Sequence, residues 1–134
     1  MLKIYTAEAR MSIKIWWLSL CLFYVYVYLC LIENLVITDF IKWGINQAMP
    51  PSFYFWQKSH ASEIDLVISS RGMTIPVEIK YSSRWDKKYL HSIDMFKEKH
   101  RGKGLKIPFS LVIYRGDFMV PREDVFCIPV WVLC

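Results

Sequence analysis

Two short aliphatic runs near the middle of the chain carry the charged residues best suited to chemistry. The first, "SEIDLVISS", contains Asp65, and the second, "TIPVEIKY", contains Glu78 and Lys80. Acidic residues are poor strand formers and bare charges are costly to bury, so their place in such runs needs a reason. Two carboxylates can share a divalent cation, and a nearby lysine can orient or deprotonate a water bound to it. That combination is suited to phosphodiester hydrolysis.

The two runs alternate in a way that predicts a β-hairpin over residues 63–69 and 74–81. One pairing collects the aliphatic side chains on a single face, with Ile64 opposite Ile79. A slip of one residue would mix the two faces, so the pattern itself selects this register.

The other face of the predicted hairpin gathers the charges. Asp65 lies opposite Glu78 there, and Glu63 lies opposite Lys80. Like charges that are directly opposed destabilise a sheet, so we expect Mg²⁺, or Mn²⁺, between Asp65 and Glu78. The alternative is a solvated face on which Glu63 and Lys80 form a surface ion pair worth less than about 1 kcal/mol. That alternative leaves the opposed Asp65 and Glu78 unexplained.

The elements that must position these residues follow from periodicity and from helix and strand breakers. Apolar residues at helical spacing predict two helices, and aromatic or β-branched runs predict further strands. The predicted helices cover residues 32–46 and 85–100, and the further strands cover 53–56, 109–115 and 125–133. Pro129 makes the last of these an edge strand. The order α-β-β-β-α-β-β predicts an α/β or α+β fold with helices packed on a sheet.

The N-terminal segment is much more apolar than the rest of the chain, so residues 1–31 and 32–134 are expected to be separate parts. Residues 15–32, "IWWLSLCLFYVYVYLCLI", contain no charge and reach the lower end of membrane-spanning length. Lys3, Arg10 and Lys14 precede them, as basic residues precede a signal peptide or a membrane anchor. Two alternatives stay open: a buried core element, and the remnant of a truncated start.

Composition bounds the classes of function. The net charge is +5, and residues 84–106 carry all of this excess, with eight Lys or Arg and three acidic residues. A basic surface permits an acidic partner such as nucleic acid or an anionic membrane. The four cysteines lack CxxC spacing, which fits a reducing cytosol better than a zinc site or a disulfide framework. The sequence has no phosphate-binding loop motif, and we interpret its aromatic residues mostly as core.

The charged pattern resembles the PD-(D/E)xK nuclease superfamily, whose fold is that of restriction endonucleases. Asp65, followed after about a dozen residues by Glu78-Ile79-Lys80, matches the signature of that superfamily. Glu33, in the preceding helix, matches its auxiliary acid, and "EID" adds Glu63. The residue before Asp65 is isoleucine, where the name-giving proline would stand.

A closer resemblance covers about residues 33–134. The segments "ENLVITDFIKW", "FYFWQKSHASEIDLVI", "IPVEIKYS" and "LVIYRGD…IPVWVL" together look like the nuclease-like C-terminal domain of unknown function on AAA-type P-loop ATPases of archaea and bacteria. The resemblance implies a mixed central sheet flanked by helices. Because this chain has no ATPase motif, an ATPase module would act in trans. Many superfamily members form homodimers.

The resemblance also implies roles for individual residues. Asp65, Glu78 and the backbone carbonyl of Ile79 would bind the metal, with Glu63 as a further ligand, and Lys80 would be the catalytic lysine. Glu33 would be an auxiliary catalytic acid.

Nucleic acid, DNA in preference to RNA, would follow the basic residues Lys87, Lys88, Lys97, Lys99, Arg101, Lys103 and Lys106. For these lysines a solvated helix face is the alternative. Two functions stay open: a Mg²⁺-dependent phosphodiesterase, and a non-catalytic docking or nucleic-acid-binding module, which includes an inactive fragment.

Overall fold

The computed structural model describes residues 2–59 and 62–133, with side chains from residue 18 onwards except at residue 59. The chain divides into two compact units, Met1–Leu31 and Ile32–Cys134. The elements in chain order are α1 (Leu2–Ile45), β1 (Ser52–Ser59), β2 (Ser62–Ser70), β3 (Met73–Ile79), the 3₁₀ turn η1 (Lys87–Tyr89), α2 (Leu90–His100), β4 (Ser110–Tyr114), β5 (Met119–Arg122), β6 (Val125–Pro129) and the 3₁₀ turn η2 (Val130–Val132).

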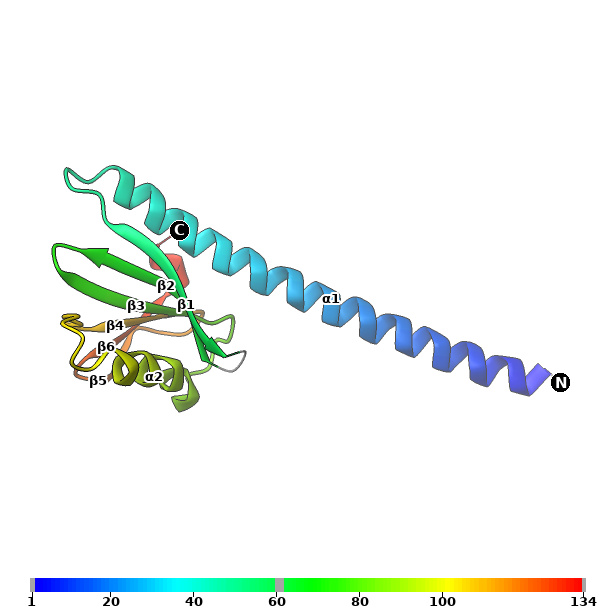
Figure 1. Ribbon diagram of the computed structural model, residues 1–134. Coiled ribbons are helices and arrows are strands. Elements are labelled where there is room, and N and C mark those ends of the chain that lie inside the picture. Colours follow the sequence, from blue (N-terminus) through cyan, green and yellow to red (C-terminus); the bar gives the residue numbers. More distant parts are fainter. Residues whose placement is uncertain (1, 60–61, 134) are drawn as a thin grey trace. The chain divides into compact units, whose positions relative to one another are not determined.

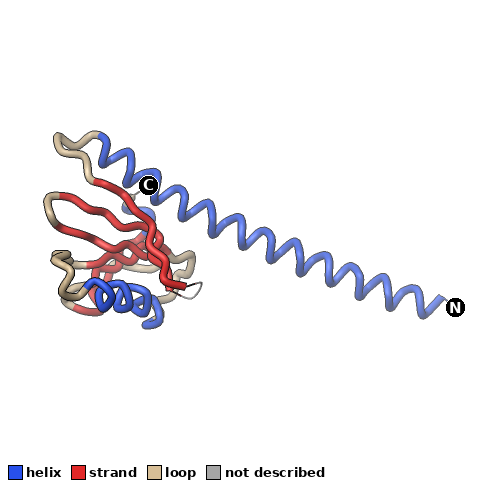
Figure 2. The backbone as a smooth tube through the Cα atoms, in the orientation of Figure 1, coloured by secondary structure: helices blue, strands red, loops and turns tan. Residues whose placement is uncertain are grey.

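A six-stranded mixed sheet with the strand order β1-β2-β3-β4-β6-β5 forms the centre of the second unit (Figures 1 and 2). Strands β1, β2 and β3 pair antiparallel, β3, β4 and β6 pair parallel, and β5 is an antiparallel edge strand. The parallel step from β3 to β4 requires a crossover, and α2 provides it. The predicted fold class, α+β with a mixed sheet, is confirmed.

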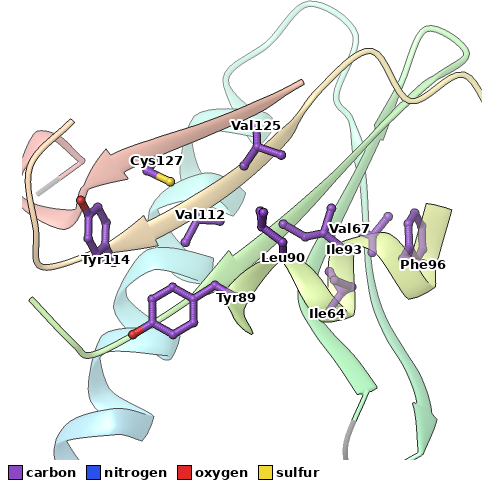
Figure 3. Packing of buried hydrophobic residues seen from close by; sticks show 10 residues of the cluster. All are labelled: Ile64, Val67, Tyr89, Leu90, Ile93, Phe96, Val112, Tyr114, Val125 and Cys127. Carbon is purple, nitrogen blue, oxygen red and sulfur yellow. The ribbon is translucent and has the colours of Figure 1, made fainter. Parts of the chain in front are cut away.

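The sheet is covered on both faces. On one face α2 buries Ile93 and Phe96 against strand residues that include Val112 and Val125 (Figure 3). On the other face Val36, from the 32–45 part of α1, packs against the remaining aliphatic strand residues. Adjacent residues such as Val112 and Ile113 belong to different clusters because successive side chains of a strand point to opposite faces.

The predicted hairpin register is confirmed over most of its length, because Leu66 pairs with Val77 and Ile68 pairs with Ile75. The prediction that Ile64 shares the aliphatic face of Leu66 is wrong, since Ile64 packs in the cluster against α2.

A register shift between β1 and β2 explains that difference. Tyr54 pairs with Val67 and Trp56 pairs with Ile64, so that Asp65 and Leu66 lie opposite the single residue Phe55. The extra residue is a β-bulge, and it reverses the inward and outward alternation at Asp65.

The predicted edge position of the last strand and the predicted start of the first helix are also wrong. The last strand, β6, is an interior strand between β4 and β5, and Pro129 is its final residue, where a missing N–H is tolerated. The edge position is taken by β5, which the sequence did not predict. The first helix extends from Leu2 to Ile45, whereas its predicted start was residue 32.

The apolar stretch is helical in the structure. Residues Leu18–Ile45 are long and apolar enough to cross a membrane by length and composition, with a mean hydropathy of 2.1. A signal sequence or a buried helix can meet the same criterion. Large apolar side chains such as Leu22 and Phe23 are exposed in this helix. Cys21, Cys30 and Cys127 are free thiols, and Cys134 lies outside the described residues.

Candidate active site

The β-bulge places Asp65 at the point where β2 and β3 separate. The carboxylate oxygen Oδ2 of Asp65 accepts a hydrogen bond from the backbone N–H of Ile79 at 2.6 Å. The paired residues of this hairpin end at Leu66 and Val77, so the side chain of Asp65 takes over where the backbone pairing stops. Burial raises the pKa of Asp65, while the Ile79 bond and the charge of Lys80 lower it.

Glu78 is the most deeply buried charged side chain at this strand end, with an exposed fraction of 3%. Its Oε1 atom forms an ion pair with the Lys80 ammonium at 2.6 Å. Its Oε2 atom is buried and has no hydrogen-bond partner among the described residues. Burial raises the pKa of Glu78 to about 7; Lys80 opposes this rise and Asp65 adds to it.

Lys80 holds its charge in spite of its surroundings. Burial alone would lower the pKa of this lysine, but the carboxylates of Glu78, Asp65 and Glu33 together raise it. The backbone N–H of Lys80 donates to the carbonyl of Ile113 at 2.8 Å. This bond continues the parallel pairing of β3 with β4 and fixes the backbone that carries the lysine.

Glu33 approaches the same strand end from α1. Its pKa is raised first by burial and then by the charge of Asp65, whereas Lys80 lowers it. The structure therefore brings the predicted auxiliary acid into electrostatic contact with the motif, although it lies 32 residues before Asp65. Glu63 is exposed and also acts on the pKa of Asp65.

The donor set for a metal is consequently small. Within residues 18–58 and 62–133, no three His, Cys, Asp or Glu side chains form a group that could hold a metal ion. Mg²⁺ commonly takes only one or two carboxylates and keeps several waters. Asp65 and Glu78 fit that pattern, because the Oε2 atom of Glu78 is an acceptor that no donor reaches within the described part of the chain. The roles of Glu63 and of the Ile79 carbonyl as ligands stay predictions.

The basic residues predicted to bind nucleic acid differ in their availability. Lys99, Lys103 and Lys106 are exposed. Others are engaged in ion pairs: Lys88 with Asp86, Lys97 with Asp124, and Arg101 with Glu98. Lys97 is only 22% exposed and belongs to a network that joins α2 to the turn between β5 and β6 through Arg122. Lys97 therefore stabilises the contact between α2 and this turn.

The structure also contains a cavity that the sequence pattern does not predict, lined by aromatic residues from β1 and α2. The interpretation of the aromatic residues as mostly core does not hold for Tyr54 and Phe55, which are 57% and 61% exposed. The signals in the sequence are the run "FYFW" in β1 and the dense basic run 97–106, at the end of α2 and in the loop that follows. Only the fold shows that the two are neighbours.

The comparisons with known proteins give a family but no activity. A family model described as a domain of unknown function, DUF4143, matches residues 30–133. No curated protein and no solved structure matches the chain. The match agrees with the expected domain of unknown function, and the PD-(D/E)xK assignment stays a prediction.

Proposed function

We propose that this chain, which belongs to the DUF4143 family of domains of unknown function, hydrolyses phosphodiester bonds of nucleic acid with the aid of a divalent metal ion. The observation that carries the proposal is the buried carboxylate of Glu78, one oxygen of which has no donor among the residues that the structure describes. Asp65 lies beside it, and Lys80 is its ion-pair partner.

The energetics of Glu78 favour the binding of a cation. A buried acceptor without a partner is unfavourable, and the penalty is larger when the group is charged. Lys80 occupies Oε1 only, and Asp65 repels the ionised form. A cation at Oε2 would satisfy the orphaned oxygen and offset the repulsion between the two carboxylates.

Each residue has a role in this proposal. Asp65 and Glu78 would hold Mg²⁺, which when bound supplies a water of lowered pKa and neutralises charge on the phosphate. Lys80 stabilises the charge that develops on the phosphate oxygens, because its ammonium lies at the carboxylate pair and keeps its proton. Glu33 contributes negative potential from α1 and is the auxiliary acid.

Nucleic acid is the substrate class that suits the surface. The excess of positive charge lies in residues 84–106, and exposed lysines follow α2. Binding through phosphate contacts releases counterions, so affinity should fall steeply with salt. We place this activity in the cytoplasm, with DNA preferred over RNA.

A second candidate is supported by the ion pair itself. Lys80 already neutralises the charge of Glu78, with its ammonium 2.6 Å from Oε1, so the two residues can be interpreted as a structural ion pair that needs no metal. In that case the domain is a non-catalytic docking module, which would bind nucleic acid or an ATPase module in trans, alone or as a homodimer.

A thermal melt separates the two candidates. The full chain, kept in a non-ionic detergent because of its apolar helix, is melted at about pH 8 with and without Mg²⁺ or Mn²⁺. The variants are Glu78→Gln, Asp65→Asn and, as a control, Glu98→Gln, which alters a carboxylate that is 66% exposed. If metal binds at a hundred times its dissociation constant, it stabilises the fold by about 2.7 kcal/mol.

The proposal expects metal to stabilise wild type and Glu98→Gln but neither site variant. It also expects Mg²⁺-dependent cleavage of a labelled oligonucleotide that Asp65→Asn, Glu78→Gln and Lys80→Ala abolish while their folds survive. Metal without effect on any melt, or cleavage retained in Asp65→Asn, would remove the nuclease reading and leave the docking module.

A further inference from the structure

A second candidate site lies away from the charged strand end. A cavity of about 350 Å³ opens between β1, β2 and α2. Its wall includes Ser69 and Thr74, which flank the turn of the β2–β3 hairpin, whereas Glu78 lies near the other end of β3. None of Asp65, Glu78 and Lys80 lines it.

The cavity has an aromatic wall. Trp56 meets Phe96 edge to face, with ring centroids 5.3 Å apart, and Phe96 lies 4.4 Å from the ring of His100. The Nδ1 atom of His100 donates to the carbonyl of Phe96 at 2.8 Å, because a carbonyl can only accept, and this bond fixes the imidazole at the wall. Phe96 is also a member of the hydrophobic core that packs against α2 (Figure 3). Tyr54 stands at the wall with 57% of its surface exposed.

A basic segment adjoins the cavity, and we call its exposed residues Lys103 and Lys106 the rim. Leu105 lines the cavity and lies in the exposed segment "KGLK", between Lys103 and Lys106. The carbonyl of Lys106 accepts a hydrogen bond from the N–H of Thr74 at 2.8 Å, which ties this segment to the cavity wall. Residues 97–106 contain five basic residues and one acidic residue, Glu98.

The combination of an aromatic wall and a basic rim fits one class of ligand, single-stranded nucleic acid. Bases stack on aromatic side chains whatever their identity, and phosphates follow basic residues. An apolar peptide would use the wall and leave the rim unpaired. A duplex would use the rim only, because its bases are stacked on each other. We propose that this cavity stacks a base of single-stranded nucleic acid while Lys103 and Lys106 bind the flanking phosphates. The inference deepens the proposed function, on which it rests for the class of substrate.

Oligonucleotide binding tests the inference without any metal. Fluorescence anisotropy of labelled oligodeoxythymidylate about 12 nucleotides long, within the usual site sizes of single-strand binders, is measured with the full chain in detergent and EDTA. A duplex of the same length serves as the competitor. The single strand should bind more tightly than the duplex.

The variants separate stacking from simple burial. Tyr54→Leu should weaken binding about fivefold or more, the loss expected when stacking worth about 1 kcal/mol is removed. Tyr54→Phe keeps the ring and should bind as wild type. Trp43→Leu changes an aromatic residue of similar exposure, 53%, that does not line this cavity, and should have no effect. Lys103→Gln and Lys106→Gln should each lower the salt slope by about one.

Two results would overturn the inference: equal affinity for the single strand and the duplex, or a Tyr54→Leu variant that is folded by circular dichroism and binds as wild type. The outcome is independent of the melt that tests the metal site. If metal fails to stabilise the protein but stacking persists, the nuclease proposal fails and this site stands. If metal stabilises the protein but Tyr54→Leu binds normally, only the base site fails.

Discussion

Replacing Glu78 by glutamine should make the protein more stable at neutral pH and leave its stability nearly unchanged in mild acid. The carboxyl group has an ordinary pKa of 4.5, and burial in the folded protein raises that pKa to about 7. Folding therefore favours the protonated form. The folded state gains from protonation of Glu78 at low pH and loses that gain as the pH rises from 4.5 to about 7.

The size of the effect follows from the shift. One pKa unit corresponds to about 1.4 kcal/mol, so the rise from 4.5 to about 7 corresponds to about 3 kcal/mol. Glutamine has the shape of the protonated acid and cannot ionise. Relative to wild type, Glu78→Gln should therefore gain about 3 kcal/mol in free energy of unfolding between pH 4.5 and pH 8.

Urea denaturation of the full chain in detergent and EDTA, at several pH values, measures this difference. The comparison of variant with wild type at each pH cancels most of the contribution from Asp65 and Glu33, whose pKa values are also raised. Glu98→Gln is the matched control for the substitution itself, because its carboxylate is 66% exposed.

The result that would refute this reasoning is a difference in free energy of unfolding between Glu78→Gln and wild type that stays constant within about 0.5 kcal/mol from pH 4.5 to pH 8, which is the size of the effect of an ordinary surface substitution. It would mean that ionised Glu78 is well solvated or that Lys80 fully compensates its charge. The Oε2 atom of Glu78 would then give no support for a bound cation.

Two further predictions concern the elements around the site. Asp65→Ala should be about 1–3 kcal/mol less stable than Asp65→Asn in urea denaturation, because asparagine keeps an oxygen for the N–H of Ile79; equal stabilities would contradict this. Gly44→Ala should destabilise by about 1–3 kcal/mol, since the added Cβ would lie 2.6 Å from the ring of Phe53. Thr38→Ala, at an exposed position of the same helix, should be neutral or stabilising, and a stabilised Gly44→Ala would show that the ring moves freely.

The register of the β2–β3 hairpin could be predicted from the sequence of these two strands, whereas the β-bulge in β2 could not. Alternation places Leu66 opposite Val77 and Ile68 opposite Ile75, and the structure confirms it, because any other register would expose aliphatic side chains. The same logic fails at Ile64. The bulge there depends on how β1 pairs on the other side of β2, and no pattern within β2 records that pairing.

For the candidate site, the sequence predicts which residues take part but not their protonation. Asp65, Glu78 and Lys80 can be picked from the sequence because charges in aliphatic strands are conspicuous. Their protonation cannot, since the pKa of Glu78 depends on burial beneath other elements. The aromatic cavity needs contacts between β1 and α2, which are about 40 residues apart, and periodicity within one element does not reach so far.

The two edges of the sheet differ in how they meet other chains. The β5 edge is a strand of four residues that contains Pro121, and both features block the addition of another strand. The β1 edge is eight residues long, has no proline and carries the exposed Tyr54 and Phe55. Extension of the sheet by another strand is thus confined to β1. Two copies joined along β1 would present only blunted β5 edges outward, so such an assembly ends at a pair and does not grow into a fibre.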